Sequence, residues 1–388
     1  TGVQTCALPI LIVQNKKEKD TTRSLDIIAS PGTHFSSNGN NCVSNCIMCI
    51  KVDVSKETKL FGKRIIVGVS TLDIINGACH FCEYVEEYDR QASLYDALER
   101  YYVTYKPSEL IIVHDKDVYT LSQVEHLIQC LNANHIKKHI LTKDGTHHLA
   151  QFVKKCASQK YQEECISLYY HTEDVYPFLE RHGLDSSRAA LASFVFLLNF
   201  VYMHDKEMIH RIQEPNRDQE DEHMLLANHS LQQLNMVSNH QYKGKYSSVV
   251  NVLDNTKTNM GKRLFRKQIL HPTTKKEWLQ KQYDCIDTIM KTSASFQQNI
   301  RQLLSNVCDI SKMYRKIVLK KMNIEYVKEF HASLQCIEKI IHLLQKEKWY
   351  EDLKSLKSYV KKIRVYIESI FVLDNTDRYF HREIYPEL

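Results

Sequence analysis

The chain has 388 residues, of which 43% are hydrophobic and 25% charged, an ordinary composition for a globular protein of about two to three domains. Its longest apolar run, residues 189–203, is shorter than the ~20 residues that a membrane-spanning helix needs, so we expect no transmembrane segment. The formal charge of +6 is uneven, because residues 247–388 hold 26 Lys and Arg against 16 Asp and Glu. A basic C-terminal half is compatible with a polyanionic partner, although solvated helix faces are often basic as well.

Twelve cysteines are scattered through apolar runs, which favours buried, reduced thiols over a disulfide framework. Two groups are candidate zinc ligands: Cys42, Cys46 and Cys49, and then Cys79, His80 and Cys82. Both groups lie in strand-like runs, where neighbouring side chains point to opposite faces, so we expect no zinc there. A set of histidines lies on different predicted elements without an H-x-x-x-H pair, and we expect core or solvent positions for His204, His210, His223 and His229.

The two ends of the chain do not read as parts of a domain. The first ten residues, TGVQTCALPI, resemble the translation of a common sequencing-adapter oligonucleotide, and we leave them out of the fold expectation. The last residues, RYFHREIYPEL, stop without a terminating signal. We therefore expect a fragment that is cut short at both ends. Its first part, residues 11–40, is a polar segment rich in Ser, Asn and Gly.

Three strand signals follow within a short stretch. They cover residues 46–54, 64–75 and 78–84. Asn76-Gly77, between the last two, predicts a two-residue hairpin turn. Helix and strand patterns then alternate over residues 93–105, 109–115, 121–133 and 138–144. A meander followed by alternating helices and strands indicates an α/β domain with a mixed sheet, which we place at residues 41–160.

From about residue 161 to the end, the pattern is helical. Residues 189–203 predict a buried core helix, with Asp185 to Arg188 as its capping segment. Apolar residues recur every three or four positions in three further stretches, within residues 303–317, 324–344 and 353–370. Such stripes are typical of amphipathic helices that pack against neighbours.

The most tightly specified stretch is SSVVNVLDNTKTNMGKRLFRKQILHP, residues 247–272, although it holds no nucleophile, metal ligand or phosphate loop. Asp254, Thr256 and Thr258 can accept hydrogen bonds from free N–H groups at a helix start, and Gly261 permits close approach in the first turn. The helix predicted over residues 259–270 has apolar residues around much of its circumference, so we expect it to be wedged among several neighbours. We interpret the stretch as a joint between structural elements, and we expect Pro272 to end its helix.

This stretch resembles the signature of the lever region of MutS-type DNA mismatch repair proteins, which runs from a Leu-Asp pair through Thr-x-Thr and Gly to Arg-Leu-Leu-Arg and a later Pro. The matching residues are Leu253, Asp254, Thr256, Thr258, Gly261, Arg263, Leu264, Arg266, Pro272 and Gln282. Phe265 replaces the second Leu of the family pattern, and Gln268 and Ile269 stand where a Trp is usual. Weaker matches, at residues 30–33, 68–81, 224–237 and 309–310, extend the resemblance over about residues 21–373.

The resemblance implies a fold of the α+β class with several domains. Residues 11–40 would be the tail of the mismatch-binding domain and a linker, and residues 41–160 an RNase H-like α/β connector domain. A mostly α-helical lever domain, residues 161–388, would follow and lead toward the clamp of the family. The implied function is the middle segment of a MutS-like DNA mismatch repair ATPase, which couples the clamp on mismatched DNA to the ATPase domain.

The same resemblance sets expectations about cofactors and partners. The family's Phe-x-Glu mismatch wedge and a G-x-x-x-x-G-K-[ST] loop are missing, so we expect a non-catalytic fragment without catalytic, cofactor or metal residues. ATP and Mg²⁺ would belong to the intact parent. The implied partners are double-stranded DNA with a mismatch or junction, a MutS-like subunit in a dimer, and a MutL-type protein at the connector. The implied location is intracellular, with nucleus, organelle and viral factory all open.

Two basic clusters are candidate DNA phosphate contacts. The cluster on the helix leading toward the expected clamp consists of Lys354, Lys357, Lys361, Lys362 and Arg364. The other consists of Lys312, Arg315, Lys316, Lys320 and Lys321. For this second cluster we favour an ordinary solvated helix face.

Two rival functions stay open. One is an RNase H-like nuclease or resolvase that holds divalent metal ions between Asp53, Asp73 and further carboxylates. The candidates for the further carboxylates, which we favour as ordinary surface acids, are Glu83, Glu86, Glu87, Asp89, Asp115 and Asp117. The other rival is a helical scaffold without a nucleic-acid role. The lever motif disfavours it, and salt-dependent DNA binding would distinguish it.

Overall fold

The computed structural model describes residues 10–15, 23–33, 43–55, 62–88, 91–145, 149–218, 223–224, 230–238, 244–346 and 353–373. By the contacts between its residues, the chain divides into two compact units. Unit 1 comprises Thr1–Leu253 and Arg266–Thr274, and unit 2 comprises Asp254–Phe265 and Lys275–Leu388. The division falls inside one helix, α9 (Asn259–Leu270), so each unit contains part of the same continuous helix.

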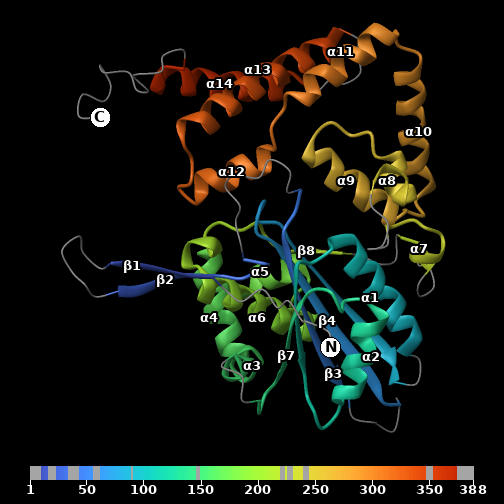
Figure 1. The fold of residues 1–388 in the computed structure, drawn as a ribbon, viewed down its shortest axis with the longest axis vertical. Helices are drawn as coiled ribbons and strands as arrows, with labels where there is room; N and C mark the ends of the chain where they lie inside the picture. The colour runs from blue at the N-terminus through green and yellow to red at the C-terminus, as the bar shows by residue number, and fades with distance from the viewer. Residues whose placement is uncertain are drawn as a thin grey trace. The chain divides into compact units, whose positions relative to one another are not determined.

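Unit 1 is built on a six-stranded sheet with the strand order β7-β6-β3-β4-β5-β8 (Figure 1). Its strands are β3 (Cys46–Val54), β4 (Arg64–Asp73), β5 (Cys79–Glu87), β6 (Glu109–His114), β7 (Lys137–Thr142) and β8 (Asn216–Arg217). β3, β4 and β5 form an antiparallel meander, whereas β6 runs parallel to β3, β7 parallel to β6, and β8 parallel to β5. The predicted mixed sheet is confirmed.

The hairpin between β4 and β5 is present, but its loop is longer than the two residues predicted. Asp73 donates its N–H to the Ala78 carbonyl at 2.9 Å, which leaves four residues in the loop. Gly77 has a φ of 73° and donates its N–H to the Asp73 carbonyl at 2.8 Å. The Asp73 carboxylate also accepts a hydrogen bond from the Ile75 N–H at 2.9 Å. Asn76-Gly77 therefore marks the turn correctly, while the Asp73 side chain stabilises a wider one.

Helices cover both faces of this sheet (Figure 1). On one face, α1 (Gln91–Tyr105) and α2 (Leu121–Cys130) share a core with strand residues such as Met48 and Ile50. On the other face lie α3 (Ala150–Cys156), α4 (Gln159–Tyr170), α5 (Val175–His182) and α6 (Arg188–His204), which share a core that includes Ile47 and Cys49. The predicted domain boundary near residue 160 thus falls inside unit 1, because α4 to α6 complete this helical layer.

The apolar helix α6 lies directly on β4, as expected for a buried core helix. A Cβ on Gly68 of β4 would come within 2.1 Å of the Ala189 backbone, so only glycine permits this approach. The capping predicted from the preceding residues is not observed, since the Ser187 side chain makes no cap hydrogen bond. Glu83 of β5 caps the helix instead, accepting a hydrogen bond from the Ala190 N–H at 3.0 Å.

Asn199 is buried inside this core, and both ends of its amide have partners. Its Oδ1 accepts hydrogen bonds from the hydroxyls of Tyr161 at 3.1 Å and Tyr169 at 3.0 Å. Its Nδ2 donates to the Val195 carbonyl at 2.9 Å and lies 3.4 Å from the Cys165 sulfur. Asn199 therefore ties α4 to α6 while its own polar atoms are satisfied.

The described part of the N-terminal segment forms an antiparallel ribbon of β1 (Ile10–Asn15) and β2 (Arg23–Ala29). Residues 1–9, which carry most of the adapter-like sequence, lie outside the described residues, as do residues 34–42.

A turn directly after β2 is held by Glu109 at the start of β6. This buried carboxylate accepts hydrogen bonds from the Ser30 hydroxyl at 2.5 Å and the Gly32 N–H at 3.0 Å, and it lies 2.7 Å from His139 Nε2. Burial alone would raise the pKa of Glu109, but these hydrogen bonds and the charge of His139 hold it below its usual range. The Ser-Pro-Gly-Thr turn is therefore fixed to the sheet through one carboxylate.

Unit 2 is helical in its described part. The helices after α9 are α10 (Lys276–Met290), α11 (Ala294–Ser305), α12 (Ile310–Val318), α13 (Ile324–Lys346) and α14 (Leu353–Ile370). In the described parts of both units, no helix is long and apolar enough to cross a membrane.

α13 and α14 pack as an antiparallel pair. His331 and Glu338 of α13 contact Glu368 and Arg364 of α14, so the order of partners reverses along the two helices. Their shared core repeats every seven residues, with Val327, Leu334 and Ile341 on α13 and Val360 and Ile367 on α14. This is the spacing of coiled-coil packing, and it confirms the stripe predicted within residues 324–344.

The basic cluster on and after α12 is not the solvated helix face that the sequence predicts. Three of its members are buried, namely Lys312, Arg315 and Lys316. The other two, Lys320 and Lys321, are exposed. The ammonium group of Lys316 lies 2.9 Å from the centroid of the Tyr326 ring, and burial lowers its pKa. A long basic side chain can bury its aliphatic stem and place its charged group on an aromatic ring. The spacing of Lys and Arg in the sequence does not reveal such burial.

Replacing Asn199 by Leu is expected to destabilise the chain, because the Tyr161 and Tyr169 hydroxyls would lose their acceptor. An unsatisfied buried group costs about 1–3 kcal/mol, so the free energy of unfolding in urea should fall by about 2–5 kcal/mol. Adding Tyr161→Phe and Tyr169→Phe to the Asn199→Leu chain removes both hydroxyls and should recover most of the loss. A triple variant no more stable than the single variant would contradict the hydrogen-bond explanation.

Candidate functional site: the anchors of helix α9

Helix α9 follows a loop whose polar side chains form hydrogen bonds within the loop and to the first turn of the helix. Asp254 Oδ1 accepts hydrogen bonds from the Thr256 N–H at 3.0 Å and the Thr256 hydroxyl at 2.5 Å. The Thr258 hydroxyl accepts a hydrogen bond from the Gly261 N–H at 3.0 Å, which makes Thr258 the N-cap of α9. A Cβ on Gly261 would lie only 3.0 Å from that hydroxyl. Thr258 thus caps the helix start as expected, whereas Asp254 accepts hydrogen bonds from the loop residue Thr256, whose hydroxyl acts as a donor.

Within unit 2, Arg263 of α9 forms a bidentate ion pair with Asp309. Nη1 lies 2.6 Å from Oδ2 and Nη2 lies 2.9 Å from Oδ1. The Asp309 side chain is 4% exposed, and it also caps α12 by accepting a hydrogen bond from the Lys312 N–H at 3.3 Å. The Ser333 hydroxyl of α13 accepts a hydrogen bond from the Cys308 N–H at 2.9 Å and so holds the residue before Asp309. The first half of α9 is therefore anchored to the start of α12.

Within unit 1, Arg266 of α9 binds the C-terminal end of α1. Its Nη2 donates a hydrogen bond to the Val103 carbonyl at 2.8 Å. Val103 lies in the last turn of α1, where carbonyls lack intrahelical partners and form the negative end of the helix dipole. Burial lowers the pKa of Arg266, but a guanidinium stays charged at neutral pH.

Lys267 and Asp218 form a second anchor within unit 1. Lys267 Nζ lies 3.0 Å from Asp218 Oδ1, and the same carboxylate accepts a hydrogen bond from the Tyr105 hydroxyl. His80 of β5 lies 3.7 Å from Asp218. Burial alone would raise the pKa of Asp218, but His80, Lys267 and Tyr105 together hold it well below its usual range. One carboxylate therefore joins α9, α1 and the sheet.

His271, directly after α9, forms a third anchor within unit 1. Its Nε2 lies 2.5 Å from the Thr104 hydroxyl, and that hydroxyl donates its only hydrogen to the Arg100 carbonyl at 2.8 Å. The hydrogen between the two residues must therefore sit on Nε2, which makes the imidazole a hydrogen-bond donor. Burial, followed by the charge of Arg100, lowers the pKa of His271 to about 3, so the imidazole is neutral at pH 7.

The apolar residues of α9 are less enclosed than the sequence predicts. Leu270 is buried in a small core with residues of α7 (Ser230–Gln233) and α8 (Val249–Leu253). Leu264 is 58% exposed, and Leu253 before the loop is 51% exposed. The expectation that α9 is wedged among several neighbours is therefore wrong for the side that carries Leu264, which the described residues leave uncovered.

Several of the anchoring partners could not be found from sequence patterns. Asp218 lies 49 residues before Lys267, and Thr104 lies 167 residues before His271, so no local spacing relates them. The family resemblance identifies Asp309, but it does not indicate the pairing with Arg263. Pro272 follows the helix as predicted, and its carbonyl accepts a hydrogen bond from the Met224 N–H at 2.9 Å.

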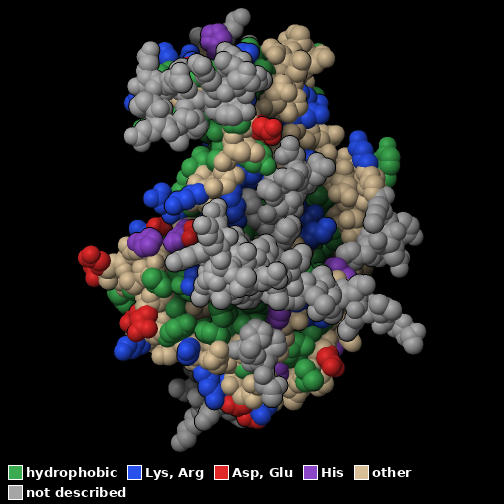
Figure 2. Space-filling model, turned by 60° about the vertical axis from the view of Figure 1, so that its left-hand side comes forward, with side chains coloured by type: hydrophobic (Ala, Val, Ile, Leu, Met, Phe, Trp, Pro, Cys, Tyr) green, Lys and Arg blue, Asp and Glu red, His purple; other side chains and the backbone are tan. Residues whose placement is uncertain are grey.

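The candidate DNA contacts on α14 divide into two kinds. The exposed ones are Lys354, Lys357, Lys361 and Lys362. Arg364 is instead paired with Glu338 at 3.1 Å and Glu368 at 2.6 Å, and the two carboxylates raise its pKa. On the face drawn in Figure 2, Asp and Glu side chains belong mostly to unit 1, whereas Lys and Arg side chains occur in both units.

The two carboxylates considered first for a nuclease do not converge. In the β3–β4 ladder, Asp53 pairs with Ile66 and Asp73 pairs with Cys46, so the two acids lie at opposite ends of the ladder. Seven residues of strand separate them, which is about 23 Å at 3.3 Å per residue. Asp53 forms an ion pair with Lys51, and Asp73 binds the β4–β5 loop. A single metal ion cannot bridge that separation.

The other candidate acids have separate positions. Glu83 caps α6, and Glu86 and Glu87 lie at the end of β5. Asp115 forms an ion pair with Lys143 at 2.6 Å and accepts a hydrogen bond from the Asp117 N–H. Asp89 lies outside the described residues. In the part of the chain that the structure describes, no group of three or more His, Cys, Asp or Glu could hold a metal ion.

The candidate zinc ligands and histidines are also dispersed. Cys49 and Cys79 belong to the core beneath α6, whereas Cys82 belongs to the core beneath α1 and α2. His204 contacts the Phe200 carbonyl and His223 faces His271, while His210 is half exposed beside Glu207. Cys42 and His229 lie outside the described residues.

The neutral state of His271 predicts a specific acid sensitivity. In the unfolded chain His271 takes up a proton as the pH falls through 6.5, whereas in the folded chain it does so only near pH 3. Stability should therefore decrease on acidification within this window, approaching about 1.4 kcal/mol per pH unit from this residue. Urea unfolding between pH 7 and pH 5 should show a shallower pH dependence for His271→Gln. The matched change His342→Gln, at an exposed position, should keep the original slope.

Comparison with known protein families gives a match to MutS domain III over residues 229–379, a range that contains α9 and the described helices of unit 2. A mutS homologue of Acanthamoeba polyphaga mimivirus, named as a DNA mismatch repair protein, is 22% identical over 327 residues, or 80% of this chain and 29% of the relative. The MutS proteins of Chlamydia abortus and Clostridioides difficile are 25% and 28% identical over 309 and 190 residues.

These alignments cover 78% and 49% of this chain, but only 32% and 19% of the Chlamydia and Clostridioides proteins. The chain therefore spans about a third or less of the length of the relatives it matches. The match to domain III includes α9 and Asp309, and the alignment with the mimivirus homologue, at 80% of this chain, is long enough that it must extend into unit 1 as well. The chain contains MutS domain III and is distantly homologous to MutS proteins over most of its length.

Proposed function

We propose that this chain is the connector and lever segment of a MutS-like DNA mismatch repair ATPase, and that it couples a clamp on mismatched DNA to the ATPase domain. The observation that supports the coupling is the double anchoring of α9. Arg263 is ion-paired inside unit 2 and Arg266, less than one turn later, is hydrogen-bonded inside unit 1. A helix that cannot stretch between two fixed ends transmits displacement of one end to the other.

The finer fold assignment is part of the same proposal. The strand order β7-β6-β3-β4-β5, in which a meander is followed by two parallel strands, supports an RNase H-like connector in unit 1. The lever would consist of the helices from α9 onward, so it would begin later than the boundary at residue 161 that the sequence indicates.

The segment itself would be non-catalytic, and ATP and Mg²⁺ would act in the ATPase domain of the intact protein. Its partners would be double-stranded DNA with a mismatch or junction, a second MutS-like subunit, and a MutL-type protein at the connector, all inside the cell. The exposed lysines of α14 would contact DNA phosphates. Arg364 would instead hold α14 on α13.

The rival functions receive less support. A metal-dependent nuclease would need Asp53 and Asp73 near one another, and the β3–β4 register separates them. A helical scaffold without a nucleic-acid role leaves the exposed lysines of α14 without a function, and a salt-dependent affinity for DNA would exclude it.

The coupling proposal is tested by Arg263→Lys in the full-length protein. Lysine keeps the charge but cannot form both hydrogen bonds to Asp309. Basal ATP hydrolysis should stay within about twofold of the unaltered protein. Stimulation by mismatched DNA should fall by about 5- to 30-fold, which corresponds to about 1–2 kcal/mol of coupling free energy.

The matched control is Arg301→Lys, the same exchange at an exposed position of α11. It should leave both basal and stimulated hydrolysis unchanged. Full mismatch stimulation in the Arg263→Lys protein would show that the Arg263–Asp309 anchor takes no part in coupling.

A further inference from the structure

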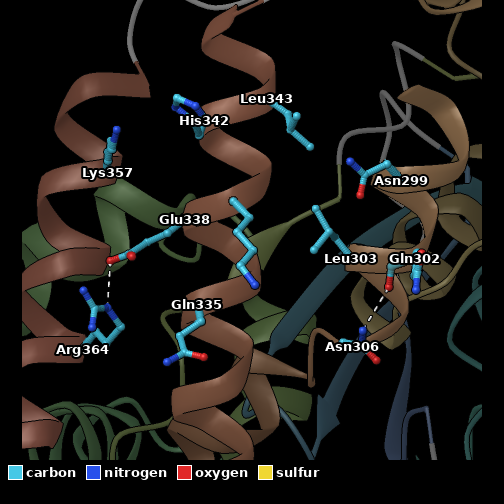
Figure 3. Close-up of a pocket in the computed structure, with 11 residues that line it drawn as sticks. Asn299, Gln302, Leu303, Asn306, Gln335, Glu338, His342, Leu343, Lys357 and Arg364 are labelled. Atoms are coloured by element: carbon cyan, nitrogen blue, oxygen red, sulfur yellow. Dashed lines mark hydrogen bonds and ion pairs between the residues drawn. The ribbon is translucent and has the colours of Figure 1, made fainter. Parts of the chain in front are cut away.

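A polar groove on unit 2 lies apart from the α9 anchors and meets the α14 cluster only at Lys357 and Arg364 (Figure 3). It has a volume of about 890 Å³ and is lined by residues of α11, α13 and α14. Neither the sequence patterns nor the family resemblance draws attention to its α11 and α13 walls.

The charge of the groove is positive. Its one lining acid, Glu338, points toward Arg364 across the α13–α14 pair, and the two groups are 3.1 Å apart (Figure 3). Lys339 of α13 and Lys357 of α14 are exposed, and neither has an ion-pair partner among the described residues. Because Glu338 is paired with Arg364, no carboxylate among the described lining residues offsets the charges of the two lysines. The exposed His342 of α13 also lines the groove.

The remaining lining is rich in amide side chains. Four amides line the groove, namely Asn299 and Gln302 of α11, Asn306 directly after α11, and Gln335 of α13. Only Leu303 and Leu343 are apolar. Protein surfaces that bind nucleic-acid backbone use Lys, Asn and Gln in this way, because ammonium and amide groups both donate hydrogen bonds to phosphate oxygens. An acidic protein segment would instead be anchored by aromatic residues or by arginines free to pair with it.

We propose that this groove binds the phosphodiester backbone of double-stranded DNA, with Lys339 and Lys357 as charge contacts and the amides of Asn299 and Gln335 as hydrogen-bond donors. The proposal rests on the proposed function for the presence of DNA. It assigns the contact to a three-helix groove rather than to α14 alone. Because phosphates carry no sequence information, binding here orients the duplex without reading it.

The test uses the 388-residue chain and a fluorescent DNA duplex, with anisotropy measured from about 50 to 200 mM salt. Neutralising both lysines in a Lys339→Gln, Lys357→Gln double variant should weaken binding about tenfold at the lowest salt. It should also reduce the slope of log K against log salt by about 2, because about one counterion is released for each phosphate contact. Asn299→Ala with Gln335→Ala should weaken binding while leaving that slope unchanged.

Two controls separate this groove from other basic surfaces. Lys276→Gln with Lys281→Gln makes the same charge change at exposed positions of α10 and should alter neither affinity nor slope. Lys354→Gln with Lys361→Gln tests α14 outside the groove. If only the α14 double variant lowers the slope, the groove assignment is wrong while DNA binding by the segment stands.

Two further outcomes would overturn the groove proposal. One is that the unaltered chain shows no salt-dependent DNA binding. The other is that polyglutamate displaces the duplex as well as unlabelled DNA does at equal charge concentration, which would assign the groove to an acidic protein. Neither outcome touches the coupling proposal, because the Arg263→Lys experiment measures ATP hydrolysis in the full-length protein.

Discussion

A buried helix end needs partners for the N–H or C=O groups that the helix itself cannot satisfy. In this chain, charged side chains meet that need at the positions that organise the fold. Glu83 of β5 caps the start of α6, and Arg266 of α9 caps the end of α1. Asp309 caps α12 and at the same time receives Arg263 from α9. Each such contact fixes one helix end to another element, so the arrangement within each unit depends on a few charged side chains.

The proposed coupling role follows from the fact that two of these contacts, those of Arg263 and Arg266, belong to one helix, α9. Residues 263 and 266 are less than one helical turn apart, yet each is held in a different compact unit. Apolar packing contributes little on the side of α9 that carries Leu264, because that residue is largely exposed. Directional hydrogen bonds of charged groups therefore set the position of the helix. Such bonds are lost abruptly when their geometry changes, which suits an element that moves between discrete states.

The local patterns of the sequence predict the elements well and their partners poorly. The strand-like run of residues 46–54 identifies β3, and the apolar run of residues 189–203 identifies α6, because a buried element consists of consecutive apolar residues. Sequence reasoning favours local caps and places the cap of α6 in the residues before it, whereas the actual cap comes from Glu83, more than a hundred residues earlier.

Long-range polar pairing leaves no such trace in the local sequence. The family motif identifies Arg263 and Arg266 as residues of one signature, but only the structure shows that they bind in different units. The buried positions of Lys312, Arg315 and Lys316 were mispredicted for a related reason. Charged residues are exposed on average, but an aromatic ring or a carboxylate nearby in the fold allows a charged side chain to be buried.

Within unit 2, Arg263 and Arg364 serve a different purpose from the exposed lysines Lys339 and Lys357. Arg263 and Arg364 are both committed to carboxylates, and their planar guanidinium groups suit fixed, bidentate or bridging contacts. Lys339 and Lys357 have no such partner in the described residues and stand exposed on neighbouring helices. An ammonium group on a flexible stem can follow a phosphate backbone without a fixed geometry, whereas a committed guanidinium would have to break an existing pair first. For this reason the contact with a mobile polyanion is better assigned to the lysines, and the maintenance of helix positions to the arginines.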